Sequence, residues 1–236
     1  MNNSSDIPWK RIGIEAAAIV GSILLAFSID AWWEERIDRV DELAQLQRLH
    51  AEFLTNIDRI DSREFEQGIL DATADVYQLI DEGRRNNQDS IEVSAVKIGR
   101  MLFAPTFDAD TPILGGLIRS GRLEIIEDEA VLSLISEWER TFYDYTTFAE
   151  RARRSVDERL IPAVVKRGDI GPVLMTRPGS FNRFEADNLP DIQLRIDDEL
   201  KGLVAERWRN GRTALNRISD ARRIAGELVA AIESAS

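Results

Sequence analysis

The longest apolar run of the chain lies near its N-terminus, from Ile12 to Trp33. It contains no charged residue between Glu15 and Asp30. A helix rises about 1.5 Å per residue, so a segment of this length would extend roughly 33 Å, close to the thickness of a bilayer's hydrocarbon core. The pattern therefore predicts a transmembrane helix over residues 12–33.

Residues suited to the membrane surface lie at both ends of this run. Tryptophan and basic side chains favour the headgroup region, where an apolar body and a polar tip are both satisfied. The predicted membrane-interface anchors are Trp9, Lys10, Arg11, Trp32 and Trp33. A cleaved signal peptide fits less well, because an acid interrupts the start of the run and bulky Ile29 stands where a cleavage site needs a small residue.

Two acidic residues lie inside the predicted span. Glu15 follows Arg11 by four residues, so the two share a helix face and can pair. Asp30 lies about one turn from the other end. Both are candidate intramembrane polar contacts, and the pattern leaves open whether they have a functional role or only reach the interface.

Small residues recur every four positions in the same segment. Such spacing lets two transmembrane helices approach closely. The two rows predicted to take part in transmembrane helix packing are Gly13, Ala17 and Gly21, and Ala18, Ser22 and Ala26.

Beyond the span, apolar residues recur at intervals of three and four, which is typical of amphipathic helices. The first such stripe comprises Ile37, Val40, Leu43, Leu46, Leu49, Phe53, Ile57 and Ile60. Further helices are expected over 65–82, 91–103, 112–120, 128–160 and 191–234, with Gly121 and Asp128 as boundary signals. Residues 123–126 are the only candidate for a brief extended piece.

These elements predict an all-α protein in which one N-terminal transmembrane helix continues into an elongated bundle of long amphipathic helices. Residues 168–190 contain three glycines and three prolines, and are expected to form the one long irregular loop. The predicted organisation is a short cytoplasmic N-terminus (1–11), the span (12–33) and an extracytoplasmic helical-bundle domain (34–236).

Charge sets the expected orientation and partners. Lys10 and Arg11 are the only bases before the span, so the positive-inside rule places them in the cytoplasm and the bundle in the periplasm of a bacterial inner membrane. The chain carries a net charge of −12, which disfavours nucleic acid as a partner. It has no cysteine, which excludes disulfides and thiolate chemistry.

Catalytic residue types are scarce. His50 is the only histidine and lies in a predicted helix with no nucleophile motif, which favours a surface or boundary role. Asp108 and Asp110 are a fragment of an oxygen-ligand site, but capping of the next helix also explains Asp110. We expect no enzymatic activity, no cofactor and no metal.

The anchor also resembles a group of uncharacterised bacterial single-span membrane proteins that contain a domain of unknown function. The similarity rests on Gly13, Glu15 and Ala26, on 29–32 (IDAW) and 34–36 (EER), and on the central segment LIRSGRLEII, residues 117–126. The resemblance implies an N-terminal anchor followed by a helical domain, and it implies no activity.

Two functional hypotheses follow. The first is a non-catalytic accessory, scaffold or assembly subunit that acts through protein–protein contacts, with the lipid bilayer and a second copy or another membrane protein as partners. The alternative is an extracytoplasmic ligand-sensing module, which would have to signal through a partner's transmembrane helices because only about 11 residues precede the span.

Overall fold

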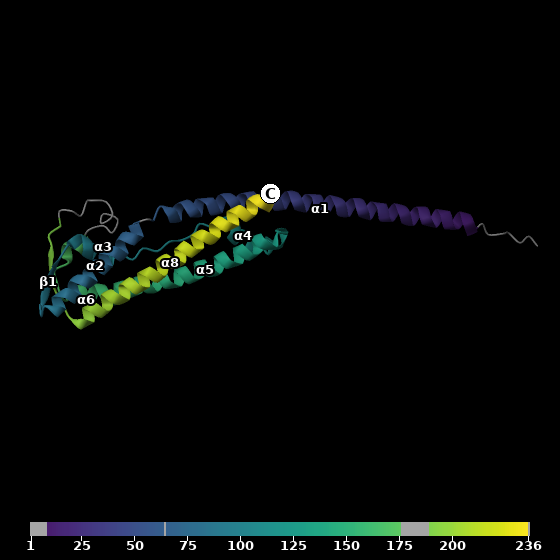
Figure 1. Cartoon of the computed structure of the whole chain (residues 1–236). Coiled ribbons are helices and arrows are strands. Elements are labelled where there is room, and N and C mark those ends of the chain that lie inside the picture. The colour runs from purple at the N-terminus through teal and green to yellow at the C-terminus, as the bar shows by residue number, and fades with distance from the viewer. Residues whose placement is uncertain (1–8, 64, 176–188, 236) are drawn as a thin grey trace, which may run out of the picture.

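A computed structural model describes residues 9–63, 65–175 and 189–235, and within these ranges the side chains from residue 20 onward except that of Phe65. The fold is dominated by three long helices: α1 (Trp9–Asp61), α5 (Glu129–Ser155) and α8 (Asp198–Ala235). Helix α8 packs along α5 and the second half of α1, while the first half of α1 projects past the bundle (Figure 1). The predicted all-α class and elongated bundle are confirmed.

The buried stripe of α1 differs from the predicted one at its start. Leu46, Leu49 and Phe53 are fully buried as expected, but Ile37 and Val40 are exposed. The bundle first covers α1 at Glu42, so these two residues have no core to enter. The predicted stripe is therefore buried only in its later part.

Helix α2 (Phe65–Arg85) passes through Gly83, where the sequence predicted an end. A side chain at Gly83 would place its Cβ 2.7 Å from Ile196 Cδ1 and 2.8 Å from Ile91 Cγ2. The glycine is thus a point of close approach inside the helix. The chain instead turns after Arg85, with Asn87 at a φ of 56°.

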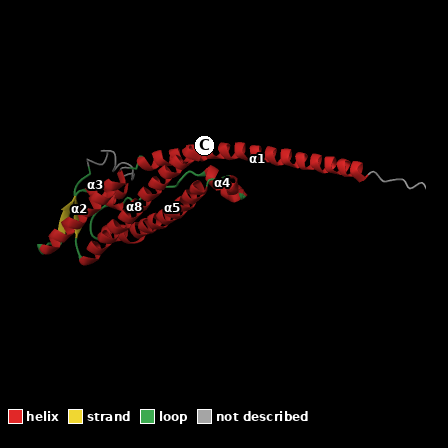
Figure 2. Cartoon of the chain, turned by 45° about the vertical axis from the view of Figure 1, so that its right-hand side comes forward, coloured by secondary structure: helices red, strands yellow, loops and turns green. Residues whose placement is uncertain are grey.

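A two-stranded antiparallel sheet replaces parts of two predicted helices (Figure 2). Strand β1 (Ser90–Val93) pairs with β2 (Ile192–Arg195) in the register Ile91 to Leu194 and Val93 to Ile192. Side chains alternate between exposed and buried along both strands. The helix predicted over 91–103 is therefore shortened to α3 (Ala95–Leu102), and the last helix begins at Asp198 rather than 191.

Pro112, Gly121 and Asp128 mark helix boundaries as predicted. Helix α4 (Pro112–Ser120) has proline in its first turn and ends at Gly121, which is left-handed with a φ of 69°. N-cap Thr111, however, makes no side-chain hydrogen bond to α4, whose first N–H groups bind Glu52 instead. A 3₁₀ turn, η1 (Arg122–Ile125), stands where a brief extended piece was expected. Asp128 caps α5, because its carboxylate accepts from the N–H of Ala130 at 2.8 Å and of Val131 at 3.0 Å.

The predicted single helix over 128–160 is interrupted near its end. A π-helical turn, η2 (Val156–Leu160), leads into α6 (Ile161–Val165), whose Pro162 lacks the N–H of a regular helix. The predicted loop 168–190 contains a short helix, α7 (Gly171–Met175), which the sequence analysis missed. Residues 176–188 of that loop lie outside the described part of the chain.

Two apolar clusters fill most of the interior. One lies near the middle of α1, where α1, α4, α5 and α8 meet. The other lies at the far end, where α2, the sheet, α3, η2, α6 and the start of α8 meet. Neither cluster includes a residue of the exposed segment 20–41; the first member on α1 is Leu46.

Candidate functional site

The projecting half of α1 is the most unusual surface of the molecule. Every residue from 20 to 41 is exposed, although this segment carries ten large apolar side chains. They are Val20, Ile23, Leu24, Leu25, Phe27, Ile29, Trp32, Trp33, Ile37 and Val40. A contiguous apolar surface of this kind marks a binding site for lipid or protein.

Several predicted site residues lie on this exposed segment. Gly21, Ser22, Ala26 and Asp30 are exposed, and a Cβ added at Gly21 would meet no atom within 4 Å. Room for a closely packed helix is therefore present along the part of the small-residue rows that the structure describes.

The aromatic end of the predicted span forms a small cluster. The ring centroids of Trp32 and Trp33 lie 6.3 Å apart, and the Arg36 guanidinium lies 5.8 Å from the Trp32 ring. A cation over an indole face is a favourable contact. This end of the segment thus combines apolar rings with a positive charge.

The other predicted site residues belong to the first turns of α1. Its backbone is helical from Trp9. The side chains of Trp9, Lys10, Arg11, Gly13, Glu15, Ala17 and Ala18 lie outside the described residues, as does the N-terminal segment 1–8. Their predicted roles stay predictions.

Among the residues whose placement is described, no helix offers a stretch that is both long and apolar enough to cross a membrane.

The base of the projecting helix is fixed by Glu42, a residue that sequence reasoning missed. Its buried carboxylate accepts from the N–H of Glu127 at 2.8 Å and from Arg39 Nη1 at 2.5 Å. Arg39 also donates to the carbonyl of Ala235 at 3.1 Å. These contacts join α1 to the segment before α5 and to the end of α8, so the exposed half leaves a fixed point of the bundle.

Two more buried polar residues of α1 bind the backbone just before and at the start of α4. Glu52 accepts from the N–H of Ile113 at 2.6 Å and of Leu114 at 3.1 Å, at the start of α4. Burial raises the pKa of Glu52 above its ordinary value, although these two hydrogen bonds act in the opposite direction. The side-chain amide of Asn56 donates to the carbonyl of Asp110 and accepts from its N–H. These bonds fix the backbone at Asp110 against α1, which is a structural role.

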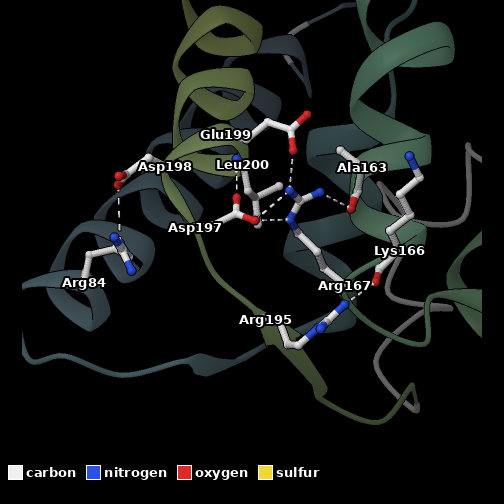
Figure 3. A network of polar contacts seen from close by, with 9 residues as sticks. All are labelled: Arg84, Ala163, Lys166, Arg167, Arg195, Asp197, Asp198, Glu199 and Leu200. Atoms are coloured by element: carbon white, nitrogen blue, oxygen red, sulfur yellow. Dashed lines mark hydrogen bonds and ion pairs between the residues drawn. The ribbon is translucent and has the colours of Figure 1, made fainter.

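A second candidate surface is an open cleft of about 1090 Å³ at the far end of the bundle. At its centre Arg167 donates to Asp197 Oδ2 at 2.7 and 3.0 Å, to Glu199 Oε2 at 2.6 Å and to the Ala163 carbonyl at 2.9 Å (Figure 3). Burial acts to raise the pKa of Asp197, but the bonds from Arg167 and from the Leu200 N–H hold it below its ordinary value. The central cation of the cleft is therefore already bound by the protein's own carboxylates.

The same pairing extends along the cleft walls. Arg159 Nη1 lies 2.7 Å from Glu206 Oε2, and Arg195 donates to the Lys166 carbonyl at 2.9 Å. The first contact attaches η2 to α8, and the second attaches β2 to the end of α6. Their first effect is to hold the end of the bundle together.

A buried arginine performs a similar structural task. Arg207 is 4% exposed, and its guanidinium donates to the carbonyls of Met101 at 2.9 Å and Phe103 at 2.8 Å, at the end of α3. Burial lowers its pKa to about 10, although the charge of Glu66 opposes this change. A cation at the C-terminus of a helix satisfies its last carbonyls.

The described residues contain no cluster of potential ligands suited to a metal ion. His50 lies at the bundle surface, with Nε2 3.0 Å from Glu233 Oε1, in the position the sequence favoured.

The chain matches no protein-family model, and comparisons with curated proteins and with solved structures likewise returned no match. The resemblance to single-span bacterial membrane proteins therefore remains a prediction.

Proposed function

We propose that this chain is a single-span, membrane-anchored helical protein that acts as a non-catalytic accessory, scaffold or assembly subunit through protein–protein contacts. The observation that carries the proposal is the exposed segment 20–41 of α1, which leaves the bundle with ten large apolar side chains uncovered. A bilayer covers this surface up to Trp33, and the bundle is held beyond the membrane.

The basic residues before the predicted span favour one orientation of the chain in the membrane. Lys10 and Arg11 favour a cytoplasmic N-terminus over residues 1–11, a span over 12–33 and a periplasmic domain over 34–236. The Trp32–Trp33–Arg36 cluster lies where the span would reach the outer interface. On this proposal, the site of action is the periplasmic face of a bacterial inner membrane.

The described contacts indicate that the charged and buried polar residues of the bundle stabilise its fold. The charged cleft neutralises its central groups internally, and the buried polar residues Glu42, Glu52, Asn56 and Arg207 bind backbone groups of their own chain. Such groups hold the fold in place. The surfaces left for function are the projecting helix and the outside of the bundle.

One observation favours a second candidate function, a ligand-sensing module that signals through a partner's transmembrane helices. The cleft of about 1090 Å³ is large enough for a small polar ligand. A cavity of about 200 Å³ also lies between Asp169, Pro172 and Val173 on one side and Pro190 on the other. Both spaces are lined by residues at or next to the ends of the predicted loop 168–190.

Purification of the full chain in mild detergent tests the leading proposal. We expect a stable homo-oligomer or a defined complex with another membrane protein, because the exposed helix is built for contacts. Light scattering on the eluted peak reads the mass. A clean monomer with no co-purifying protein would contradict the scaffold proposal.

A further inference from the structure

One face of α1 carries a row of evenly spaced residues that extends beyond the C-terminal end of the predicted span. The row comprises Trp33, Ile37, Val40, Ala44, Gln47, Ala51 and Leu54, with intervals of four and three residues in alternation. This is the spacing of the contact positions of a coiled coil. Ile37, Val40 and Leu54 are 49%, 61% and 42% exposed. Gln47 and Ala51 are also exposed and Ala44 is half-buried, so the row is open along most of its length and apolar at every position except Gln47.

The bundle lies on the other side of the helix. Val40 and Leu49 are nine residues apart, about two and a half turns at 3.6 residues per turn, so they point in opposite directions. Leu49 is fully buried, as is Asn56 one heptad further on. In both views the bundle accompanies α1 along one side only (Figures 1 and 2). A second helix can therefore approach the row without meeting the bundle.

Lipid does not account for this face. Ile37 and Val40 follow the predicted span and are interleaved with Glu34, Glu35 and Asp38, which belong in water. The apolar row continues to Leu54, well inside the bundle domain. Its occupant is therefore another protein surface.

The charged residues beside the row indicate that a second copy of this chain binds it. With Ile37 and Val40 at the contact positions, Arg36 and Asp41 take the two flanking positions of a heptad. When two copies lie parallel, Arg36 of one copy faces Asp41 of the other, whereas an antiparallel pair would oppose like charges. Both side chains are already placed beside the row, Arg36 over Trp32 and Asp41 with its Oδ2 3.3 Å from Arg122 Nη2.

We infer that two copies of this chain pair in parallel along the row from Trp33 to Leu54, with each Arg36 opposite the other copy's Asp41. The inference rests on the proposed membrane anchor, since two copies inserted in the same orientation are held parallel. It makes the protein a symmetric dimer with the two bundles on opposite outer sides of a central pair of α1 helices.

Single-cysteine cross-linking in membranes tests the pairing, because the natural chain has no cysteine. Ile37→Cys and Val40→Cys are expected to give a disulfide-linked product of twice the chain mass on mild oxidation. Glu35→Cys is the matched control, since Glu35 is also exposed but lies one heptad before the buried Glu42, on the opposite face. It is expected to remain monomeric under the same conditions.

A charge reversal supplies the second test. In the Val40→Cys background, Arg36→Glu is expected to reduce the cross-linked fraction several-fold, and Asp41→Arg added to it is expected to restore that fraction. Equal cross-linking of all three cysteine positions, a product of any other mass, or no product at all would overturn the inference.

Fractionation of the same samples separates the two claims. If the chain is soluble but Ile37→Cys still forms the dimer, the anchor is wrong and the pairing stands. If the chain is held in the membrane and neither cysteine on the row cross-links, the anchor stands and the pairing is wrong.

Discussion

Leu25→Arg is expected to release the full-length chain from the membrane fraction. Leu25 lies near the middle of the predicted span and is 63% exposed on the projecting half of α1. An arginine at the centre of a transmembrane helix costs about 2.5 to 3.5 kcal/mol on insertion scales, which lowers the equilibrium constant for insertion by roughly 60- to 300-fold. Fractionation after an alkaline wash, followed by immunoblotting, reads the result.

Glu35→Arg is the matched control for this substitution. It adds an arginine at an exposed position of the same helix, but beyond the end of the span, so the chain should stay in the membrane. Thermal unfolding of the bundle should be unchanged in Leu25→Arg, because the substituted side chain lies outside both apolar clusters. Continued membrane binding of Leu25→Arg would show that the apolar segment is not the anchor.

Phe53→Ala is expected to destabilise the bundle by about 3 to 5 kcal/mol. Phe53 is fully buried where α1, α5 and α8 meet, and its ring lies edge-on to Trp138 with centroids 5.0 Å apart. In a domain of this size, that loss lowers Tm by roughly 6 to 20 °C. Circular dichroism during heating of the full chain in detergent measures it.

Tyr143→Ala provides the comparison for Phe53→Ala. Tyr143 is an aromatic residue of α5 that is 71% exposed, so its removal leaves the core intact. We expect a Tm close to that of the natural chain. Similar losses of Tm in both variants would contradict the assignment of the α1 face that enters the core.

Long periodic segments were predictable from the sequence, but the buried face of α1 was not fully so. The row Glu42, Leu46, Leu49, Phe53, Asn56 and Ile60 keeps the helical period and is buried throughout. A stripe defined by apolar residues alone leaves out Glu42 and Asn56. The predicted stripe therefore began at Ile37 and Val40, which are exposed. Both buried polar residues are satisfied by backbone groups distant in sequence, which no local pattern reveals.

Local chemistry predicted helix boundaries better than it predicted strands. Gly121 and Asp128 end and cap their helices through contacts within a few residues, so the sequence carries the whole signal. Strands β1 and β2 have four residues each and lie about a hundred residues apart in sequence. Their pairing depends on tertiary packing, and a segment of that length is too short to show a period.

The candidate functional surfaces also include features that the sequence predicts locally and features that only the fold creates. The length and apolar character of residues 12–33 are local properties, so the amino-acid sequence alone is enough to predict an anchor there. The contacts of Arg167 and Arg207 join segments that only the fold brings together, so no local pattern predicts them. The openness of the row from Trp33 to Leu54 also depends on where the bundle lies.

Protease access in spheroplasts, with the mass of the mature N-terminus, tests whether residues 12–33 are an uncleaved anchor that holds the bundle in the periplasm. The full chain would carry a reporter at its C-terminus. We expect Met1 to be retained and the C-terminal domain to be removed by protease added outside. A domain that is protected until the membrane is dissolved, or a chain that lacks residues 1–30, would contradict an uncleaved anchor with its bundle in the periplasm.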